Sequence, residues 1–164
     1  MYRHWLGSLV LFLAVAAVVL RPWEGELESG PASAVVRVAR VIDGDTIEVR
    51  LGGREEDVRL IGVDTPETVK PDTPVQCFGE RASHYTKRRL TGQRVRLVFG
   101  VERRDVYGRL LAYVYLRGRF FNPTLVRRGL ARSLTIPPND RFAPRFRHLE
   151  LTAARAGRGL WGAC

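Results

Sequence analysis

The sequence predicts an α+β fold: a small closed β-barrel of five strands with three helices packed beside it, preceded by an apolar N-terminal segment. Three observations predict this fold. Five β-rich runs follow residue 34. One helical stretch lies between the third and fourth runs, and two helical stretches follow the fifth run. A chain of 164 residues with 45% hydrophobic composition suits one domain plus an extension. We therefore expect the domain to span residues 35–164.

The N-terminal extension, residues 1–34, begins with an uncharged apolar run from Trp5 to Leu20, and residues 21–33 have the composition of a linker. As a helix the apolar run reaches about 24 Å, short of a hydrocarbon core of about 30 Å, which fits a signal peptide or a short anchor. Small-residue cleavage patterns occur at Ala14–Ala16 and Ala32–Ala34. We expect an extracytoplasmic protein, either secreted or attached to the membrane through residues 5–20, and the sequence leaves both alternatives open.

The first three strands are predicted to form a meander. Residues 35–42 and 46–51 are β-rich and are joined by Asp43-Gly44-Asp45, in which Asp-Gly is a signal for a tight hairpin. A second turn at residues 52–54 leads into a third run. This run ends at Asp64, because a proline two residues later cannot donate a hydrogen bond to a sheet.

A helix is predicted over residues 77–90, where apolar side chains recur at i, i+4 and i+7 from Phe78. Thr91-Gly92 is expected to end it. Residues 94–99 then alternate apolar and mostly basic side chains, which predicts the fourth strand.

The remaining chain is predicted to hold the fifth strand and two helices. Residues 100–107 read as a charged connection, and residues 109–116 as a strand. Asn122-Pro123 is typical of an N-cap followed by proline at the first helical position, and Gly129 is placed to end that helix. Residues 142–156 carry an apolar stripe with helical spacing. A five-stranded OB-type barrel is the simplest architecture with this order of elements.

The charge of the chain indicates a polyanionic partner. The formal net charge is +10, and residues 35–164 contain 25 lysines and arginines against 14 aspartates and glutamates. Only Lys70 and Lys87 are lysines, and arginine binds phosphates with two parallel hydrogen bonds. Nucleic acid is the first candidate and acidic lipid or polysaccharide the second. The alternative is a general arginine bias in composition.

The acids near the first hairpin predict a metal site. Asp45 follows the hairpin turn and Asp64 ends the neighbouring strand. Adjacent strands lie about 4.8 Å apart, so the two carboxylates can meet at one cation. Hard carboxylate oxygens without nearby cysteine or histidine suit Ca²⁺ or Mg²⁺. The carbonyl of Thr65 is a further candidate ligand. Asp43 either supports the metal ligands without contacting the cation or only forms the turn.

The same region contains candidates for hydrolysis of a phosphodiester. Glu67 is a candidate general base on water, and Arg59 and Arg109 are candidates for stabilising the charge on the phosphate. Arg59 and Asp64 would lie about 16 Å apart along a flat strand. They can serve one phosphate only if the strand bends, and Gly62 between them is where a bulge is tolerated.

Each of these candidates has an ordinary structural alternative. Tyr107 precedes a glycine turn and can stack on a base or donate to a phosphate, but it can equally be an aromatic residue on the barrel rim. Arg109 can be a solvated strand start. The acids after Val63 can be solvated groups at an exposed strand end.

Four segments taken together resemble the staphylococcal-type nuclease family, in family order and over most of residues 35–161. They are Val41–Thr46, Arg59–Thr68, Asp105–Tyr113 and Asn122–Ala131. The resemblance implies an OB-fold barrel with three helices and Ca²⁺-dependent hydrolysis of DNA and RNA that leaves 3′-phosphate ends. By position it implies these roles: calcium ligands Asp45, Asp64 and the carbonyl of Thr65; general base Glu67; phosphate-binding Arg59 and Arg109; nucleotide contact Tyr107.

Two departures from the type member of that family concern the substrate. Val106 stands where the type member has a lysine, and residues 132–138 replace a segment with tyrosines that shape the nucleotide pocket. These differences bear on substrate affinity and base preference, and the residues of the implied chemistry are all present.

The two cysteines, Cys77 and Cys164, are predicted to form one disulfide, because a pair in an exported protein is readily oxidised. The type nuclease lacks this bridge, although some exported relatives resemble the pattern. The alternative is two unrelated thiols.

Two other functions compete with a nuclease. A catalytically silent OB barrel would only bind nucleic acid, but such modules tend to lose the acids or the base that this chain retains. A basic module of the membrane surface is supported only by the charge and the apolar N-terminus. The sequence implies no protein partner, and we expect a monomer that acts on DNA and RNA.

Overall fold

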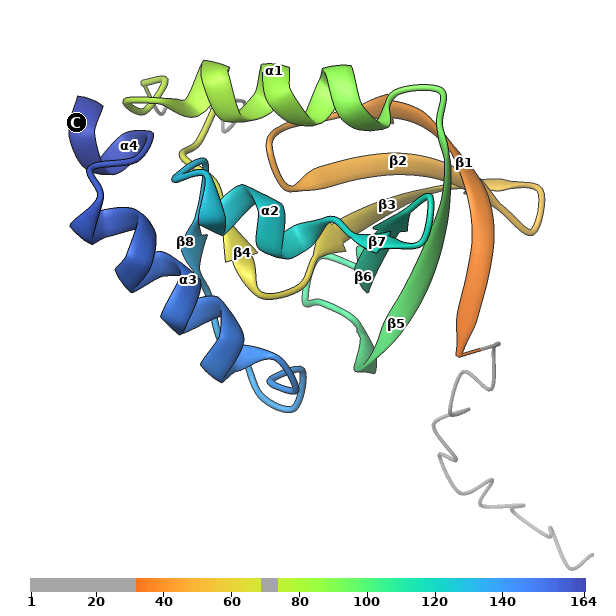
Figure 1. Cartoon of the computed structure of the whole chain (residues 1–164). Coiled ribbons are helices and arrows are strands. Elements are labelled where there is room, and N and C mark those ends of the chain that lie inside the picture. The colour runs from red at the N-terminus through yellow and green to blue at the C-terminus, as the bar shows by residue number, and fades with distance from the viewer. Residues whose placement is uncertain (1–31, 69–73) are drawn as a thin grey trace, which may run out of the picture.

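The structure, a computed structural model, describes residues 32–68 and 74–164 (Figure 1). Five long strands form a barrel: β1 Ser33–Val41, β2 Thr46–Leu51, β3 Arg54–Leu60, β5 Arg94–Arg104 and β6 Leu110–Leu116. They are hydrogen-bonded in the order β3-β2-β1-β5-β6. Parallel pairing of β6 with β3 closes the barrel, so the predicted five-stranded barrel is confirmed.

The smaller elements lie at the edges of this barrel. Strand β7 (Arg119–Phe120) forms a hairpin with β6, and β4 (Val63–Asp64) pairs with β8 (Arg132–Ser133). The helices are α1 Gly79–Leu90, α2 Asn122–Arg127, α3 Ala143–Arg155 and the single turn α4 Leu160–Ala163. Helix α1 crosses one end of the barrel, and α2 and α3 pack together beside it (Figure 1). The three predicted helices are thus present, and α4 is additional.

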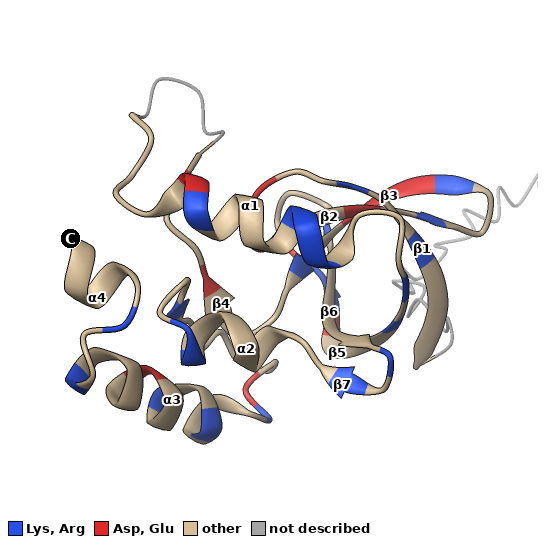
Figure 2. Cartoon of the chain, turned by 45° about the horizontal axis from the view of Figure 1, so that its top comes forward, with Lys and Arg blue, Asp and Glu red and all other residues tan. Residues whose placement is uncertain are grey.

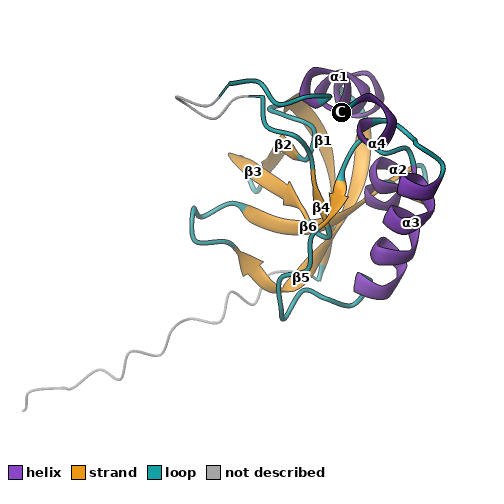
Figure 3. Cartoon of the chain, turned by 90° about the vertical axis from the view of Figure 1, so that its left-hand side faces the viewer, coloured by secondary structure: helices purple, strands orange, loops and turns teal. Residues whose placement is uncertain are grey.

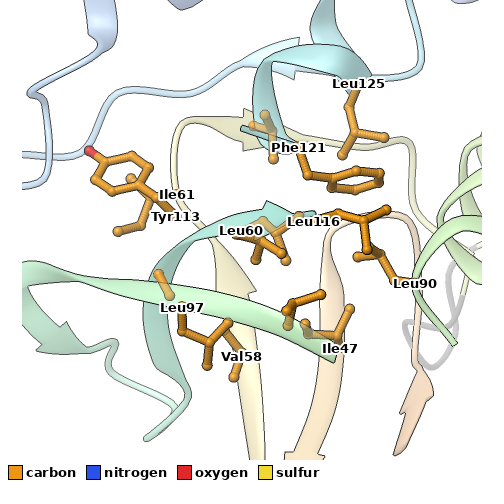
Figure 4. Close-up of a cluster of buried hydrophobic side chains, with 14 of the residues drawn as sticks. Ile47, Val58, Leu60, Ile61, Leu90, Leu97, Tyr113, Leu116, Phe121 and Leu125 are labelled. Atoms are coloured by element: carbon orange, nitrogen blue, oxygen red, sulfur yellow. The ribbon is translucent and has the colours of Figure 1, made fainter. Parts of the chain in front are cut away.

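The barrel interior is filled by alternate residues of the strands, as the period of two predicts (Figure 4). Residues 94–99 of β5 alternate between exposed or half-buried and buried positions. Leu60 lies inside the barrel, and Leu90 of α1 meets Phe121 and Leu125 of the α2 region at the covered end. Burial of each large aliphatic side chain contributes about 1.5–3 kcal/mol, so this cluster fixes where α1 and α2 sit.

Three strand limits differ from the prediction by two residues or more. The third strand, predicted to run to Asp64, ends at Leu60, and Val63–Asp64 forms the separate strand β4. Strand β1 begins at Ser33, and β5 continues through Arg104, so the predicted charged connection is wrong for residues 100–104. Beyond Phe99 the register against β6 shifts, which removes the alternating pattern that marks a strand in the sequence. The side chain of Asn139 holds this extension by hydrogen bonds of 3.2 and 2.8 Å to the backbone N–H and carbonyl of Glu102.

Asn122 has a different role from the predicted helix cap. Its side chain is fully buried; the amide nitrogen donates to the carbonyl of Ile61 at 2.9 Å, and its oxygen accepts from the N–H of Val114 at 2.9 Å. Helix α2 begins at Asn122 without a side-chain cap, although Pro123 does occupy the first turn. The amide therefore joins the end of β3 to β6, a tertiary contact that the local pattern does not reveal.

The sulfur atoms of Cys77 and Cys164 lie 2.09 Å apart, and the two Cα atoms are 6.0 Å apart. This geometry agrees with the predicted disulfide, which requires Cα atoms within about 7 Å. The bond joins the segment before α1 to the end of the chain after α4.

The predicted signal or anchor segment at residues 5–20 and the cleavage pattern at Ala14–Ala16 lie outside the described residues and stay predictions, as does the domain boundary. Within residues 32–68 and 74–164, none of the helices has the length and apolar character needed to cross a membrane.

Candidate active site

A cleft of about 520 Å³ opens where the β1–β2 loop, the end of β3, β4 and the β5–β6 loop meet. Figure 3 shows the β5–β6 loop projecting on one side of the barrel, opposite α2 and α3. The cleft is lined by every side chain to which the sequence assigns a catalytic, metal-binding or nucleotide-binding role: Asp45, Arg59, Asp64, Thr65, Glu67, Tyr107 and Arg109. The fold therefore gathers the whole predicted set.

The β1–β2 loop is shaped by two contacts that position Asp45. The Asp43 carboxylate accepts the N–H of Asp45 at 2.9 Å, so Asp43 acts as the turn former that the sequence allowed. Gly44 is needed for close approach, because a Cβ there would lie 2.7 Å from the side chain of Thr65. The carbonyl of Gly44 accepts a 2.7 Å hydrogen bond from the buried hydroxyl of Thr86 in α1, which anchors the loop on the helix.

Asp45 is a buried carboxylate, with 4% of the residue exposed. Its Oδ2 accepts from the N–H and the hydroxyl of Thr65 at 2.6 and 2.8 Å, and its Oδ1 pairs with Arg59 Nη1 at 2.8 Å. Desolvation raises the pKa of Asp45 from 3.8 to about 7, against the opposing charge of Arg59, and the charge of Asp43 adds to the rise. A further positive charge nearby would stabilise the ionised form of this buried carboxylate.

Arg59 joins the two candidate metal ligands. Its Nη2 pairs with Asp64 Oδ1 at 3.0 Å, while Nη1 pairs with Asp45 and donates to the carbonyl of Val63 at 2.9 Å. The 16 Å separation of a flat strand is avoided because the chain breaks between β3 and β4 at Gly62, where φ is +85°. The glycine predicted to tolerate a bulge therefore turns the chain, and Asp64 folds back onto Arg59.

Glu67 lines the same cleft, one residue after the proline that ends β4 pairing. Its Oε1 accepts the N–H of Thr68 at 2.8 Å. Its own N–H donates to the Gln76 side chain at 3.0 Å, and its carbonyl accepts the N–H of Gln76 at 2.9 Å. Gln76 thus clamps the backbone at Glu67, a role for which the sequence gives no local signal.

Arg109 is oriented by Asp105, which the sequence reasoning missed. Asp105 Oδ2 accepts from Arg109 Nε at 2.7 Å, and Oδ1 accepts the backbone N–H groups of Tyr107 and Arg109 at 3.0 Å each. The guanidinium carbon of Arg109 lies 5.3 Å from the centre of the Tyr107 ring. The sequence does contain a signal for this arrangement, because Asp105 stands three residues before Gly108, and aspartate and glycine in such positions favour a turn.

Beside the cleft lies an apolar hollow of about 280 Å³ whose lining includes Arg59, Tyr107, Val106, Leu134 and Ile136. Val106 and Tyr107 are 94% and 80% exposed, so the hollow opens to solvent between two apolar edges. Val106 and residues 132–138 are the positions at which the sequence departs from the type nuclease. Residues that differ from the type nuclease, namely Val106, Leu134 and Ile136, thus form part of the lining of this hollow.

The donor set fits a hard divalent cation. Asp45 and Asp64 each pair with one nitrogen of the Arg59 guanidinium, and the negative charge of Asp43 lies near Asp45. Within residues 32–68 and 74–164, no group of three or more histidine, cysteine, aspartate or glutamate side chains is placed so that it could hold a metal ion. The site therefore offers few protein ligands, all of them oxygen, and suits Ca²⁺ or Mg²⁺ with water completing the shell.

Comparison with known proteins gives consistent matches. Residues 57–163 match the family described as staphylococcal nuclease homologue. The chain is 45% identical over 160 residues to a thermonuclease of Staphylococcus intermedius, covering 94% of this chain and 95% of that protein. It is 42% identical over 160 residues to a thermonuclease of Staphylococcus hyicus, with 92% and 95% covered. It is also 43% identical over 128 residues to endonuclease YncB of Bacillus subtilis, with 77% and 61% covered.

Proposed function

Because this chain belongs to the staphylococcal nuclease family and is therefore a nuclease that hydrolyses phosphodiester bonds, we propose that it is an exported, Ca²⁺-dependent endonuclease of DNA and RNA. The observation that carries the proposal is convergence. Two aspartates, one glutamate and two arginines from separate segments line a single cleft. This is the set needed to hold a cation, accept a proton from water and stabilise a phosphate.

Asp45, Asp64 and the carbonyl of Thr65 would hold the calcium ion. A calcium ion in this position would neutralise charge on a nonbridging phosphate oxygen and orient the attacking water. The burial of Asp45 supports this role, because desolvation raises the pKa of its carboxyl even though Arg59 and Thr65 stabilise the charged form. Thr65, which donates twice to Asp45, fixes the carboxylate in place.

Glu67 would accept the proton of the attacking water. Its hydrogen bond from the N–H of Thr68 and the clamp from Gln76 fix the position of the carboxylate at the cleft. A positioned carboxylate base contributes about 10²–10⁴-fold to a rate. Glu67 takes the proton of water as the water oxygen attacks phosphorus, the bond from phosphorus to the leaving oxygen of the sugar breaks, and that oxygen takes up a proton from solvent.

Arg59 and Arg109 would bind the phosphate from two directions. Planar guanidinium groups donate two parallel hydrogen bonds to phosphate oxygens and stabilise the negative charge that develops during attack. Asp105 supports this role for Arg109, because it orients the guanidinium from behind. Arg59, which is bridged to both aspartates, would share its donors between the carboxylates and the phosphate.

Tyr107 and the apolar hollow beside it would receive a nucleobase. The exposed ring and the nearby Leu134 and Ile136 offer stacking and apolar contact without hydrogen-bond readout. This arrangement supports cleavage with little base preference, at sites where the base is unstacked.

Export is supported by the N-terminal apolar run and by the cysteine pair. Residues 5–20 have the composition of a signal peptide or an anchor, and disulfides persist in oxidising compartments. Whether the segment is removed is answered by N-terminal sequencing of the mature protein.

The experiment that tests the function is digestion of single-stranded and double-stranded DNA and RNA by the purified protein, with Ca²⁺ and then with a chelator. We expect hydrolysis in Ca²⁺ with 3′-phosphate ends, and its loss on chelation. Asp64→Asn should require more Ca²⁺, while the matched change Asp57→Asn, at another exposed aspartate of the cleft, should not. Undiminished hydrolysis in the chelator would refute calcium dependence.

A further inference from the structure

A second groove, of about 610 Å³, lies between α1, the β6–β7 turn and α2. It shares no lining residue with the catalytic cleft. Its lining contains five arginines and no acid: Arg89, Arg117, Arg119, Arg127 and Arg128. Figure 2 shows basic segments on α1, at the end of α2 and at β7, on the same face of the molecule. The groove is thus a concentration of positive charge outside the proposed chemistry.

The guanidinium groups of this groove are available to a ligand. All five arginines are exposed, and none of them forms an ion pair within the described part of the chain. By contrast, Arg59, Arg104 and Arg109 are each paired with a carboxylate. Positive charges that cluster without neighbouring acids repel one another, so binding of a polyanion would stabilise this arrangement.

The wall of the groove is aromatic as well as basic. Arg128 lies over the ring of Tyr85, with 5.1 Å between the guanidinium carbon and the ring centre. Tyr85 in turn stacks on Phe121 at 6.2 Å between ring centres. The half-buried Tyr85 therefore lies between Arg128 and the core aromatic Phe121, and it holds the guanidinium of Arg128 at the groove wall.

Helix α1 connects this groove to the catalytic cleft. On its buried face, Thr86 donates to Gly44 in the loop that positions Asp45. On another side of the helix, Tyr85 and Arg89 line the groove, and Lys87 and Arg88 are exposed. Helix α1 thus contributes to both sites: it anchors the loop of the catalytic cleft and it lines the groove.

We propose that the groove between α1, β7 and α2 binds the phosphodiester backbone of the same polynucleotide at a position outside the catalytic cleft. The inference rests on the proposed function, because it assigns this ligand as the substrate. It predicts that long nucleic acids bind more tightly than fragments that fill only the cleft. Each phosphate neutralised in the groove adds about 0.7–0.9 to the slope of log affinity against log salt.

The test compares two triple variants with equal loss of charge. The groove variant is Arg89→Gln, Arg119→Gln and Arg127→Gln, which removes one arginine from each wall. The control is R54Q/R147Q/R155Q, three exposed arginines that line neither the groove nor the cleft. The substrates are plasmid-length DNA and a trinucleotide, and KM and kcat are measured for both at several salt concentrations.

We expect the groove variant to raise KM for long DNA about tenfold and to lower its salt slope by about 2–3, with the trinucleotide unchanged. The control should change KM by less than about twofold. Equal effects of the two variants on long DNA would overturn the proposal. So would loss of binding to phosphatidylglycerol vesicles with unchanged KM for DNA, since the groove would then serve a membrane surface. Failure of the wild type to cleave the trinucleotide in Ca²⁺ would instead refute the proposed function, while the salt slope of DNA binding would still report on the groove.

Discussion

Replacing Gly44 by alanine tests how the β1–β2 loop supports calcium binding. Gly44 does not have a positive φ, so the substitution introduces no strain of the left-handed region. Its cost is steric: the new Cβ would lie 2.7–2.8 Å from three side-chain atoms of Thr65. Ordinary contacts of a Cβ begin near 3.4 Å, so Thr65 must move away by several tenths of an ångström.

The consequence falls on Asp45, because Thr65 donates two hydrogen bonds to its carboxylate at 2.6 and 2.8 Å. A hydrogen bond to a charged group contributes about 1.5–3 kcal/mol, which corresponds to roughly a tenfold to hundredfold change in an equilibrium constant. We therefore expect Gly44→Ala to raise the Ca²⁺ concentration for half-maximal hydrolysis by about tenfold or more. Overpacking should also lower the free energy of unfolding by about 1–3 kcal/mol.

The assay is a Ca²⁺ titration of DNA hydrolysis, paired with chemical denaturation of each variant. Gly52→Ala is the matched control: it lies in the exposed β2–β3 turn at φ +58° with no atom within 4 Å of the new Cβ. This control should lose about 1 kcal/mol of stability through its backbone conformation and should keep its Ca²⁺ requirement. An unchanged Ca²⁺ midpoint in Gly44→Ala, with stability lowered as in the control, would refute the link from Gly44 through Thr65 to the metal.

Three further outcomes are expected. Asp105→Asn should lower kcat on DNA by about tenfold with little change in stability, because the guanidinium of Arg109 loses its charged partner; a full rate in steady-state assays would show that Arg109 needs no such support. Replacing Cys77 and Cys164 by serine should lower the free energy of unfolding by at most about 4.6 kcal/mol, the loop-entropy value for a sequence separation of 87, and denaturation curves indifferent to the change would contradict the bond. Asn122→Ala should cost about 2–5 kcal/mol by thermal or urea unfolding, because it leaves the carbonyl of Ile61 and a strand N–H unpaired; a loss below 1 kcal/mol would argue against this bridge.

The barrel was predictable because its signals are local. The alternation of residues 94–99 marks the inward face of β5, and Gly52-Gly53 and Gly118 give the turns positive φ values that glycine adopts readily. The continuation of β5 through residues 100–104 was not predictable from alternation, since that part is held by Asn139 from a distant loop. Register and strand length depend on such tertiary contacts.

The candidate site also combines residues that the sequence predicts with residues that only tertiary contacts place there. Its aspartates, glutamate and arginines lie in segments that can be recognised in the sequence. The turn at Gly62 explains how Arg59 reaches Asp64. The groups that hold them, such as Thr86 against Gly44 and Gln76 against Glu67, are ordinary polar residues far away along the chain. Only the fold shows that they are neighbours.

The loop that carries Asp45 depends on elements that belong to the core. Thr86 is fully buried on α1, whose position is set by the packing of Leu90 into the covered end of the barrel. A change on the inner face of α1 should therefore alter the Ca²⁺ requirement as well as stability. The proposed second groove is lined by Tyr85 and Arg89, on a neighbouring side of the same helix.

We propose that five converging side chains serve one reaction: two aspartates hold calcium, Glu67 takes the proton of water, and two arginines bind the phosphate. Turnover by Glu67→Gln tests this proposal most directly. The variant keeps the size of the side chain and removes its basicity, so at saturating Ca²⁺ and DNA we expect kcat to fall by at least about 10²-fold. Affinity for DNA should be retained, as measured by fluorescence anisotropy. A kcat equal to that of the wild type would contradict the account, because the water would then lose its proton to some other group.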